Sequence, residues 1–128
     1  MLSKNMEHYV AEVATNFKRG TTEMLLLSLL KTEEWYAYDL SKALKEKSAG
    51  LFDIQGPSLY TALYRLQERG YVSTREEKVG RRIRVYYQIL PEGEEYLSQI
   101  ADAYRSVSAG IHAVLSSAGI SITEEDAQ

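Results

Sequence analysis

The sequence predicts a mainly α-helical fold with a small antiparallel β-hairpin, and three observations carry this prediction. Apolar residues recur every three or four positions over most of the chain, as they do along one face of a helix. They alternate with polar residues only between Tyr71 and Ile89, which is typical of strands. Glycine and proline separate the periodic segments, as at Gly56-Pro57. The length of 128 residues is that of one domain.

The first segment, residues 1–19, predicts a helix with a single apolar stripe formed by Met6, Val10, Val13 and Phe17. This helix is too short to bury the stripe by itself, so we expect it to need a partner. A second helix follows Gly20, and its run from Met24 to Leu30 is apolar nearly all round. Such a helix is expected at the centre of a core.

The third predicted helix carries an amphipathic pattern and ends at Ser48-Ala49-Gly50. Its pattern is set by Tyr36, Leu40, Ala43, Leu44 and Lys47. Residues 51–55 are expected to be a connector, and so is the stretch around Trp35, the only tryptophan.

The fourth predicted helix begins at Gly56-Pro57 and ends before Gly70, because proline is tolerated in the first turn and glycine ends helices. Its inward face consists of Leu59, Ala62, Leu63 and Leu66. The opposite face is polar and aromatic, with Thr61, Tyr64 and Glu68 in the middle and Ser58 and Arg65 beside them. Tyr60 lies at the border, where packing is favoured over contact with a ligand.

Two strands follow, Tyr71 to Val79 and Arg82 to Ile89, joined through Gly80-Arg81 as a hairpin. In the second strand one side is mostly apolar and the other carries Arg82, Arg84, Tyr86 and Gln88. We expect Tyr87 in the core and Tyr86 half-exposed. The apolar side is formed by Ile83, Val85, Tyr87 and Ile89.

Residues 91–117 predict a last helix with a heptad seam, which indicates pairing with a second copy of the chain together with the N-terminal stripe. The seam consists of Leu97, Ile100, Tyr104, Val107, Ile111 and Val114. The acidic segment 118–128 is expected to be a flexible tail.

The net charge of -3 is unevenly distributed along the chain. Residues 56–90 hold seven Lys or Arg against three Asp or Glu, whereas residues 91–128 hold one against seven. A basic segment followed by an acidic one is expected if a single surface meets a polyanion. A solvated basic face is the alternative that charge alone leaves open.

The order of helix, connector, helix and basic hairpin over residues 20–90 is that of a winged helix-turn-helix. The motifs within residues 18–97 resemble, in order and spacing, those of the PadR family of transcriptional regulators. They are Thr21 to Leu27, Tyr38-Asp39-Leu40, Pro57 to Leu66, Gly70-Tyr71-Val72, and Gly80-Arg81-Arg82 followed by Tyr86-Tyr87. The single helix after the hairpin resembles the small, LmrR-like subfamily.

This resemblance implies a cytoplasmic homodimeric repressor that binds a pseudo-palindromic operator in double-stranded DNA and inserts the Pro57 to Arg69 helix into the major groove. Thr61, Tyr64 and Arg65 are placed to reach base edges, with Tyr60 beside them, and Ser58 is placed for a phosphate. Sequence-independent attraction is expected from Lys78, Arg81, Arg82 and Arg84. For the hairpin arginines, a charge cluster that protects the sheet edge is the alternative.

Tyr104 has two interpretations. Relatives that bind drugs carry a tryptophan near this place, so the resemblance implies a small aromatic or hydrophobic effector in a pocket of Phe17, Tyr104 and Val107. Packing at a dimer interface without a ligand is favoured over this, because Tyr104 lies in the heptad seam.

Three residues depart from the family pattern. Ala37 replaces a glycine, Val85 a basic residue and Leu90 a threonine that would cap the last helix. These changes concern operator contacts more than the fold.

No enzyme, cofactor or metal site is expected from this sequence. It lacks cysteine, and its two histidines, His8 and His112, lie in terminal helices. No phosphate-binding glycine loop, metal-ligand spacing or membrane-length apolar run appears. A winged-helix module that binds protein instead of DNA stays open as the alternative function.

Overall fold

The computed structural model describes residues 2–122, with side chains from residue 5 onward, and it confirms the mainly helical fold with its hairpin. The elements are α1 (Leu2–Arg19), α2 (Thr22–Thr32), β1 (Trp35–Tyr36), α3 (Ala37–Lys47), α4 (Pro57–Glu68), β2 (Val72–Val79), β3 (Arg82–Ile89) and α5 (Pro91–Ser117). The expected tail 118–128 is described only to residue 122, and its remainder lies outside the described residues.

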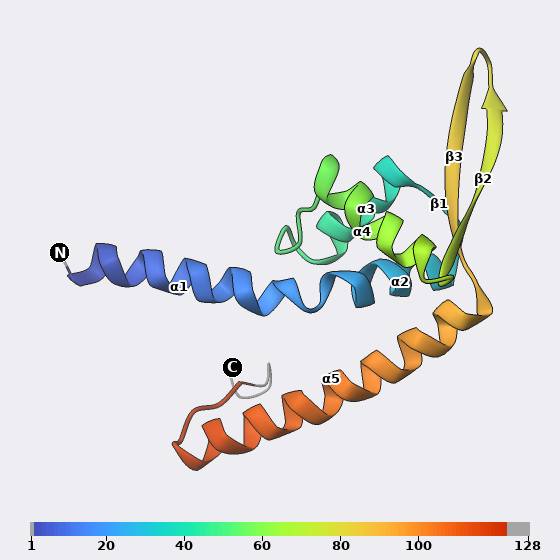
Figure 1. Ribbon diagram of the computed structural model, residues 1–128. Coiled ribbons are helices and arrows are strands. Elements are labelled where there is room, and N and C mark those ends of the chain that lie inside the picture. The colour runs from blue at the N-terminus through green and yellow to red at the C-terminus, as the bar shows by residue number, and fades with distance from the viewer. Residues whose placement is uncertain (1, 123–128) are drawn as a thin grey trace.

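The core lies where α2, α3 and α4 meet the base of the hairpin (Figure 1). The central helix α2 buries most of its surface, which explains its nearly continuous apolar sequence. Removing each leucine side chain from water contributes about 1.5–3 kcal/mol. The most completely buried side chains are Leu26, Leu27, Leu40, Leu63, Leu66 and Val72.

The sheet has three antiparallel strands in the order β1-β3-β2, so the prediction that Trp35 lies in a connector is wrong. Trp35 pairs with Tyr87 and Tyr36 with Tyr86. Tyr36 therefore belongs to β1 and precedes α3 instead of opening it. A strand of two residues is too short to show alternation, which is why the sequence does not reveal it.

Beyond β1, strands β2 and β3 continue as a long ribbon, here called the wing, that leaves the body of the domain (Figure 1). Only the base of the wing packs on the core, through Val72, Tyr87 and Ile89. Tyr86 is half-buried, as expected. The side chain of Ile83 is 59% exposed, because the apolar side of the ribbon runs past the end of the core.

An ion pair and two aromatic contacts fix the base of the wing. The carboxylate of Glu34, next to β1, accepts hydrogen bonds from the Arg75 guanidinium of β2, with an Nε to Oε distance of 2.8 Å. The same guanidinium lies 4.6 Å from the centre of the Tyr86 ring, and that of Arg84 lies 5.0 Å from the Tyr36 ring. These contacts join segments far apart in the sequence.

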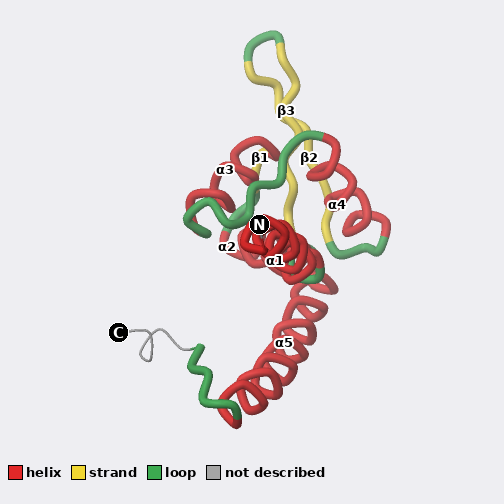
Figure 2. Tube along the Cα trace, turned by 90° about the vertical axis from the view of Figure 1, so that its left-hand side faces the viewer, coloured by secondary structure: helices red, strands yellow, loops and turns green. Residues whose placement is uncertain are grey.

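Helices α1 and α5 project from the domain toward the same side and diverge (Figure 1). Seen almost along α1, the wing and α5 extend on opposite sides of it (Figure 2). The first turns of α5 belong to the core, because Leu97 is buried there and Tyr96 stacks on Tyr71 with ring centres 4.3 Å apart. As expected for Leu90, no side-chain cap begins α5.

The close approach of α5 to the chain before β2 requires glycine at position 93. A Cβ built on Gly93 would lie 2.1 Å from the carbonyl oxygen of Tyr71 and 2.9 Å from Cγ1 of Ile89. We therefore expect Gly93→Ala to lower the free energy of unfolding. Overpacking a core costs about 1–3 kcal/mol, and this substitution should cost at least as much. Urea unfolding followed by circular dichroism measures this.

Gly110→Ala, in the same helix, is the matched control, since no atom of the described residues outside the neighbouring helix backbone lies within 4 Å of a Cβ at this position. This change should stabilise the chain by up to about 1 kcal/mol, because alanine favours the helix. Equal effects of the two substitutions would contradict the close approach.

The Glu34–Arg75 pair predicts a pH dependence of stability. Hydrogen bonding from Arg75 lowers the pKa of Glu34 below its ordinary value of 4.5. A lowered pKa in the folded state means that the carboxylate stabilises the fold above that ordinary value and loses its contribution as the pH falls through the folded-state pKa. Glu34→Gln should therefore lower the melting temperature at neutral pH, and the difference from the native protein should shrink on acidification.

Thermal melts over a pH series test this, with the exposed neighbour Glu33→Gln as control. A Glu34→Gln difference that is independent of pH would show that the ion pair does not stabilise the wing.

Candidate nucleic-acid interface

Helix α4 presents an exposed polar and aromatic face because its leucines are committed to the core. It begins after Gly56, whose φ of 59° is one that residues other than glycine rarely adopt. Leu59, Leu63 and Leu66 are buried, which turns the remaining face to solvent. The structure thus brings together on α4 the five predicted contact residues Ser58, Tyr60, Thr61, Tyr64 and Arg65, all of them exposed.

The tyrosines of α4 differ in their surroundings. Tyr64 is 60% exposed, and hydrogen bonding to the Glu68 carboxylate raises the pKa of its hydroxyl. Tyr60 is 53% exposed, so the interpretation of this side chain as a packing residue is wrong. It lies at the edge of α4 that faces α3 and lines a hollow there.

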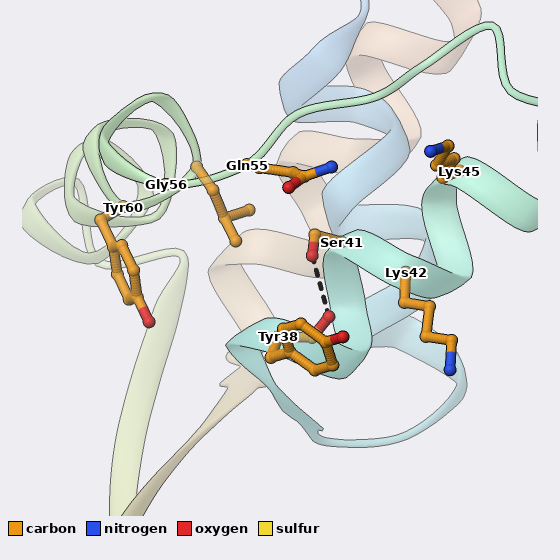
Figure 3. Close-up of a pocket in the computed structure, with 8 residues that line it drawn as sticks. Tyr38, Ser41, Lys42, Lys45, Gln55, Gly56 and Tyr60 are labelled. Carbon is orange, nitrogen blue, oxygen red and sulfur yellow. Dashed lines mark hydrogen bonds between the residues drawn. The ribbon is translucent and has the colours of Figure 1, made fainter.

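Two hollows flank this face of α4. One, of about 320 Å³, lies between α3 and α4 and is lined by Tyr38, Lys42 and Lys45 of α3 and by Tyr60. Figure 3 shows Tyr60 on one side of this hollow and the α3 residues on the other. The second, of about 560 Å³, is lined by Ser58, Thr61 and Arg65 of α4 together with Arg19 and Glu23.

The sequence does not identify three of these lining residues as candidates for a contact. They are Arg19, Tyr38 and Lys42. The basic end of the first helix, Lys18-Arg19 directly before Gly20, was a signal that could have pointed to one of them. Nothing in the spacing of Tyr38 and Lys42 indicates that they lie beside Tyr60.

The predicted cations of the wing divide between its two faces. Arg82 and Arg84 share the face of Tyr86, whereas Lys78, paired with Ile83, lies on the other. Arg81 lies in the turn between the strands. All four are exposed, but Arg84 sits over the Tyr36 ring and opposite Glu77, so it is the most engaged of them within the protein.

The expected interface residues of α1 and α5 are mostly exposed. Those on α1 are Met6, Val10 and Val13, and those on α5 are Tyr104, Val107, Ile111 and Val114. Leu97 and Ile100 differ, since Leu97 is buried in the core and Ile100 packs against it. The uncovered stripe of α5 therefore begins at Tyr104, because the first turns of the helix belong to the domain.

The three residues expected to form an effector pocket are all exposed, and none of them lines either hollow beside α4. Phe17 is 75% exposed, Tyr104 52% and Val107 62%, and the two hollows beside α4 are lined by other residues.

Among the described residues, no cluster of three or more histidine, aspartate or glutamate side chains is arranged to hold a metal ion. None of the described helices combines the length and apolar character needed to cross a bilayer.

Comparison with known proteins assigns this chain to a family. Residues 26–99, more than half of the chain, match the model of the transcriptional regulator PadR-like family. A PadR family transcriptional regulator from Eggerthella lenta is 27% identical, with a TM-score of 0.81 over 88% of this chain and 96% of that one. A transcriptional regulator from Clostridium thermocellum is 31% identical, with a TM-score of 0.71 over 75% of this chain and 94% of that one.

PadR of Bacillus subtilis, whose structure is in complex with operator DNA, shares the fold at 21% identity. Its TM-score is 0.57, over 62% of this chain and 45% of that one. The match of the family model over most of the winged domain carries the assignment, and the chain belongs to the PadR-like family of transcriptional regulators.

Proposed function

We propose that this regulator binds double-stranded operator DNA by inserting α4 into the major groove and setting the wing against the backbone or minor groove. The exposed side of α4, with Thr61, Tyr64 and Arg65 beside one another, carries the proposal, because arginine and polar side chains on one helix face can read base edges. Arg81 and Arg82 near the tip of the wing supply the phosphate attraction. PadR from B. subtilis, which shares this fold, is known in complex with operator DNA, and this supports DNA as the partner.

We further propose that the chain acts in the cytoplasm as a homodimeric repressor. The apolar stripes of α1 and α5 support the dimer, since Val10, Val107 and Val114 are each more than half exposed in the single chain. Two copies related by a two-fold axis would present two α4 helices to half-sites about 34 Å apart, on a pseudo-palindromic operator.

A small aromatic or hydrophobic effector is proposed to release the repressor. Phe17, Tyr104 and Val107 support this, because their exposed side chains lie on the two helices that would meet at the dimer interface. A ligand between them would alter the spacing of the two α4 helices, which is the quantity that DNA binding depends on. The tyrosine at position 104 offers a flat ring for stacking.

The DNA-binding proposal is tested by selecting sequences from a random pool of duplexes with the native protein. We expect one pseudo-palindromic sequence to be enriched. Arg65→Ala should weaken binding to it by about 1–3 kcal/mol and relax the preference at one base pair of each half-site. Fluorescence anisotropy against a scrambled duplex measures both effects.

The double substitution Arg81→Ala, Arg82→Ala should weaken binding to the selected and the scrambled duplex alike, because phosphate contacts carry no sequence information. Lys31→Ala, an exposed cation at the end of α2, is the control. Failure of any sequence to be enriched, with no binding at low salt, would favour the protein-binding module instead.

The dimer is tested by Val107→Asp, which places a charge in the exposed stripe of α5. We expect the native chain to sediment at twice its monomer mass and the variant at the monomer mass, since burying an unpaired carboxylate is costly. Ser98→Asp, exposed on α5 outside the stripe, should leave the mass unchanged. A native monomer would contradict the proposal.

A further inference from the structure

The two hollows beside α4 acquire a role if this helix enters DNA, a role that rests on the proposed function. A helix with its side chains is about 10–12 Å across and fills a major groove that is about 12 Å wide. The two phosphate backbones that border the groove must then run along the two flanks of the inserted helix. In this protein each flank of α4 has a hollow, and each hollow is lined by at least one cation from another helix.

We infer that the duplex is gripped from both sides of α4 by two side chains outside it, Arg19 of α1 on one flank and Lys42 of α3 on the other. Each would contact a phosphate of the backbone nearest to it, without reading any base. The grip would set how deeply and at what angle α4 enters the groove.

On the α1 flank, Arg19 and Arg65 line the same hollow as Ser58 and Thr61. Among the described residues, Glu23 is the only acidic one that lines it, and the carboxylate of Glu23 lies 3.4 Å from the Arg69 guanidinium and 3.5 Å from the Tyr96 hydroxyl. Its charge is therefore already compensated. Neither Arg19 nor Arg65 takes part in a salt bridge within residues 5–122. The hollow thus offers the uncompensated guanidinium of Arg19 to a phosphate, beside Arg65, which is proposed to read a base.

On the α3 flank, no acidic side chain of the described residues lines the hollow. Lys45 is partly neutralised, because its Nζ lies 3.5 Å from the Asp53 carboxylate. Lys42 is exposed and makes no salt bridge with any described residue. Tyr38 is 65% exposed and lines the same hollow as Lys42 (Figure 3), so its hydroxyl is a second group there that can donate to a phosphate. A phosphate here would meet one full positive charge and two tyrosine hydroxyls.

Arg19 is also the last residue of α1, the helix whose apolar stripe is proposed to pair with a second copy. The position of this DNA contact therefore depends on how α1 is held in the dimer. An event that turns α1 would move Arg19 relative to α4. It would thereby regulate DNA binding through the Arg19 phosphate contact.

The test compares Arg19→Gln, Lys42→Gln and the double variant with the native protein on two duplexes, the selected operator and a scrambled sequence of the same length. Each single change should remove one phosphate contact per protomer. The ratio of affinities between about 50 and 200 mM salt should then fall by roughly 3- to 4-fold for each phosphate interaction that is removed. The affinity should fall by the same factor on both duplexes.

Matched controls separate charge from folding. Arg19→Lys keeps the charge and should keep the salt dependence, and Lys47→Gln removes an exposed α3 cation that lines neither hollow. Thermal melts identify any variant that fails to fold, in which case the other flank still tests the grip.

The outcomes are distinct. Native salt dependence in both Gln variants, with intact operator binding, would overturn the two-sided grip and leave the proposed function standing. Weakening on the selected duplex alone would also overturn it, because it would indicate base readout. A native protein that binds neither duplex at low salt would instead remove the DNA-binding proposal, and the grip with it.

Discussion

The packing of the leucine face of α4 against α2 and α3 is the constraint on which the rest of this structure depends. Leu59, Leu63 and Leu66 are buried together, so α4 cannot rotate about its axis without exposing them to water. That rotation is what decides which side chains face outward. The same hydrophobic contact that stabilises the domain therefore orients Thr61, Tyr64 and Arg65 as one surface. The proposed recognition of DNA needs no other interaction to orient these side chains.

The wing, unlike α4, is positioned by contacts at its base and not by burial in the core. Beyond its base it contacts little of the core, and Ile83 is largely exposed although the strand pattern is that of a half-buried ribbon. Its orientation relative to α4 is set at the base, where Arg75 joins Glu34 and lies over Tyr86. Exposed ion pairs contribute little stability by themselves. Here the geometry matters more, because a small tilt at the base is magnified at the tip, where Arg81 and Arg82 are proposed to meet the DNA.

The terminal helices leave apolar side chains of the single chain uncovered. α5 is part of the core at Leu97 and becomes an exposed apolar stripe from Tyr104 onward, while α1 has an exposed stripe along its length. A monomer rarely leaves so much apolar surface uncovered. Because α1 ends at Arg19 beside α4 and α5 begins beside the wing, whatever covers these stripes would also hold in place the two elements that are proposed to bind DNA.

The sequence alone determined the elements whose signal is local. The helices and the hairpin follow from apolar period, and the separation of α4 into a leucine face and a polar face follows from helix geometry, since 3.6 residues per turn fix which side chains lie together. The family was also accessible, because its motifs are contiguous. Only the tertiary structure decided the features that depend on distant segments meeting. These are the pairing of Trp35 with Tyr87, the division of α5 between the core and an exposed stripe, and the placement of Arg19 and Lys42 on either flank of α4. Such contacts depend on how whole surfaces pack, and no spacing along the chain encodes that.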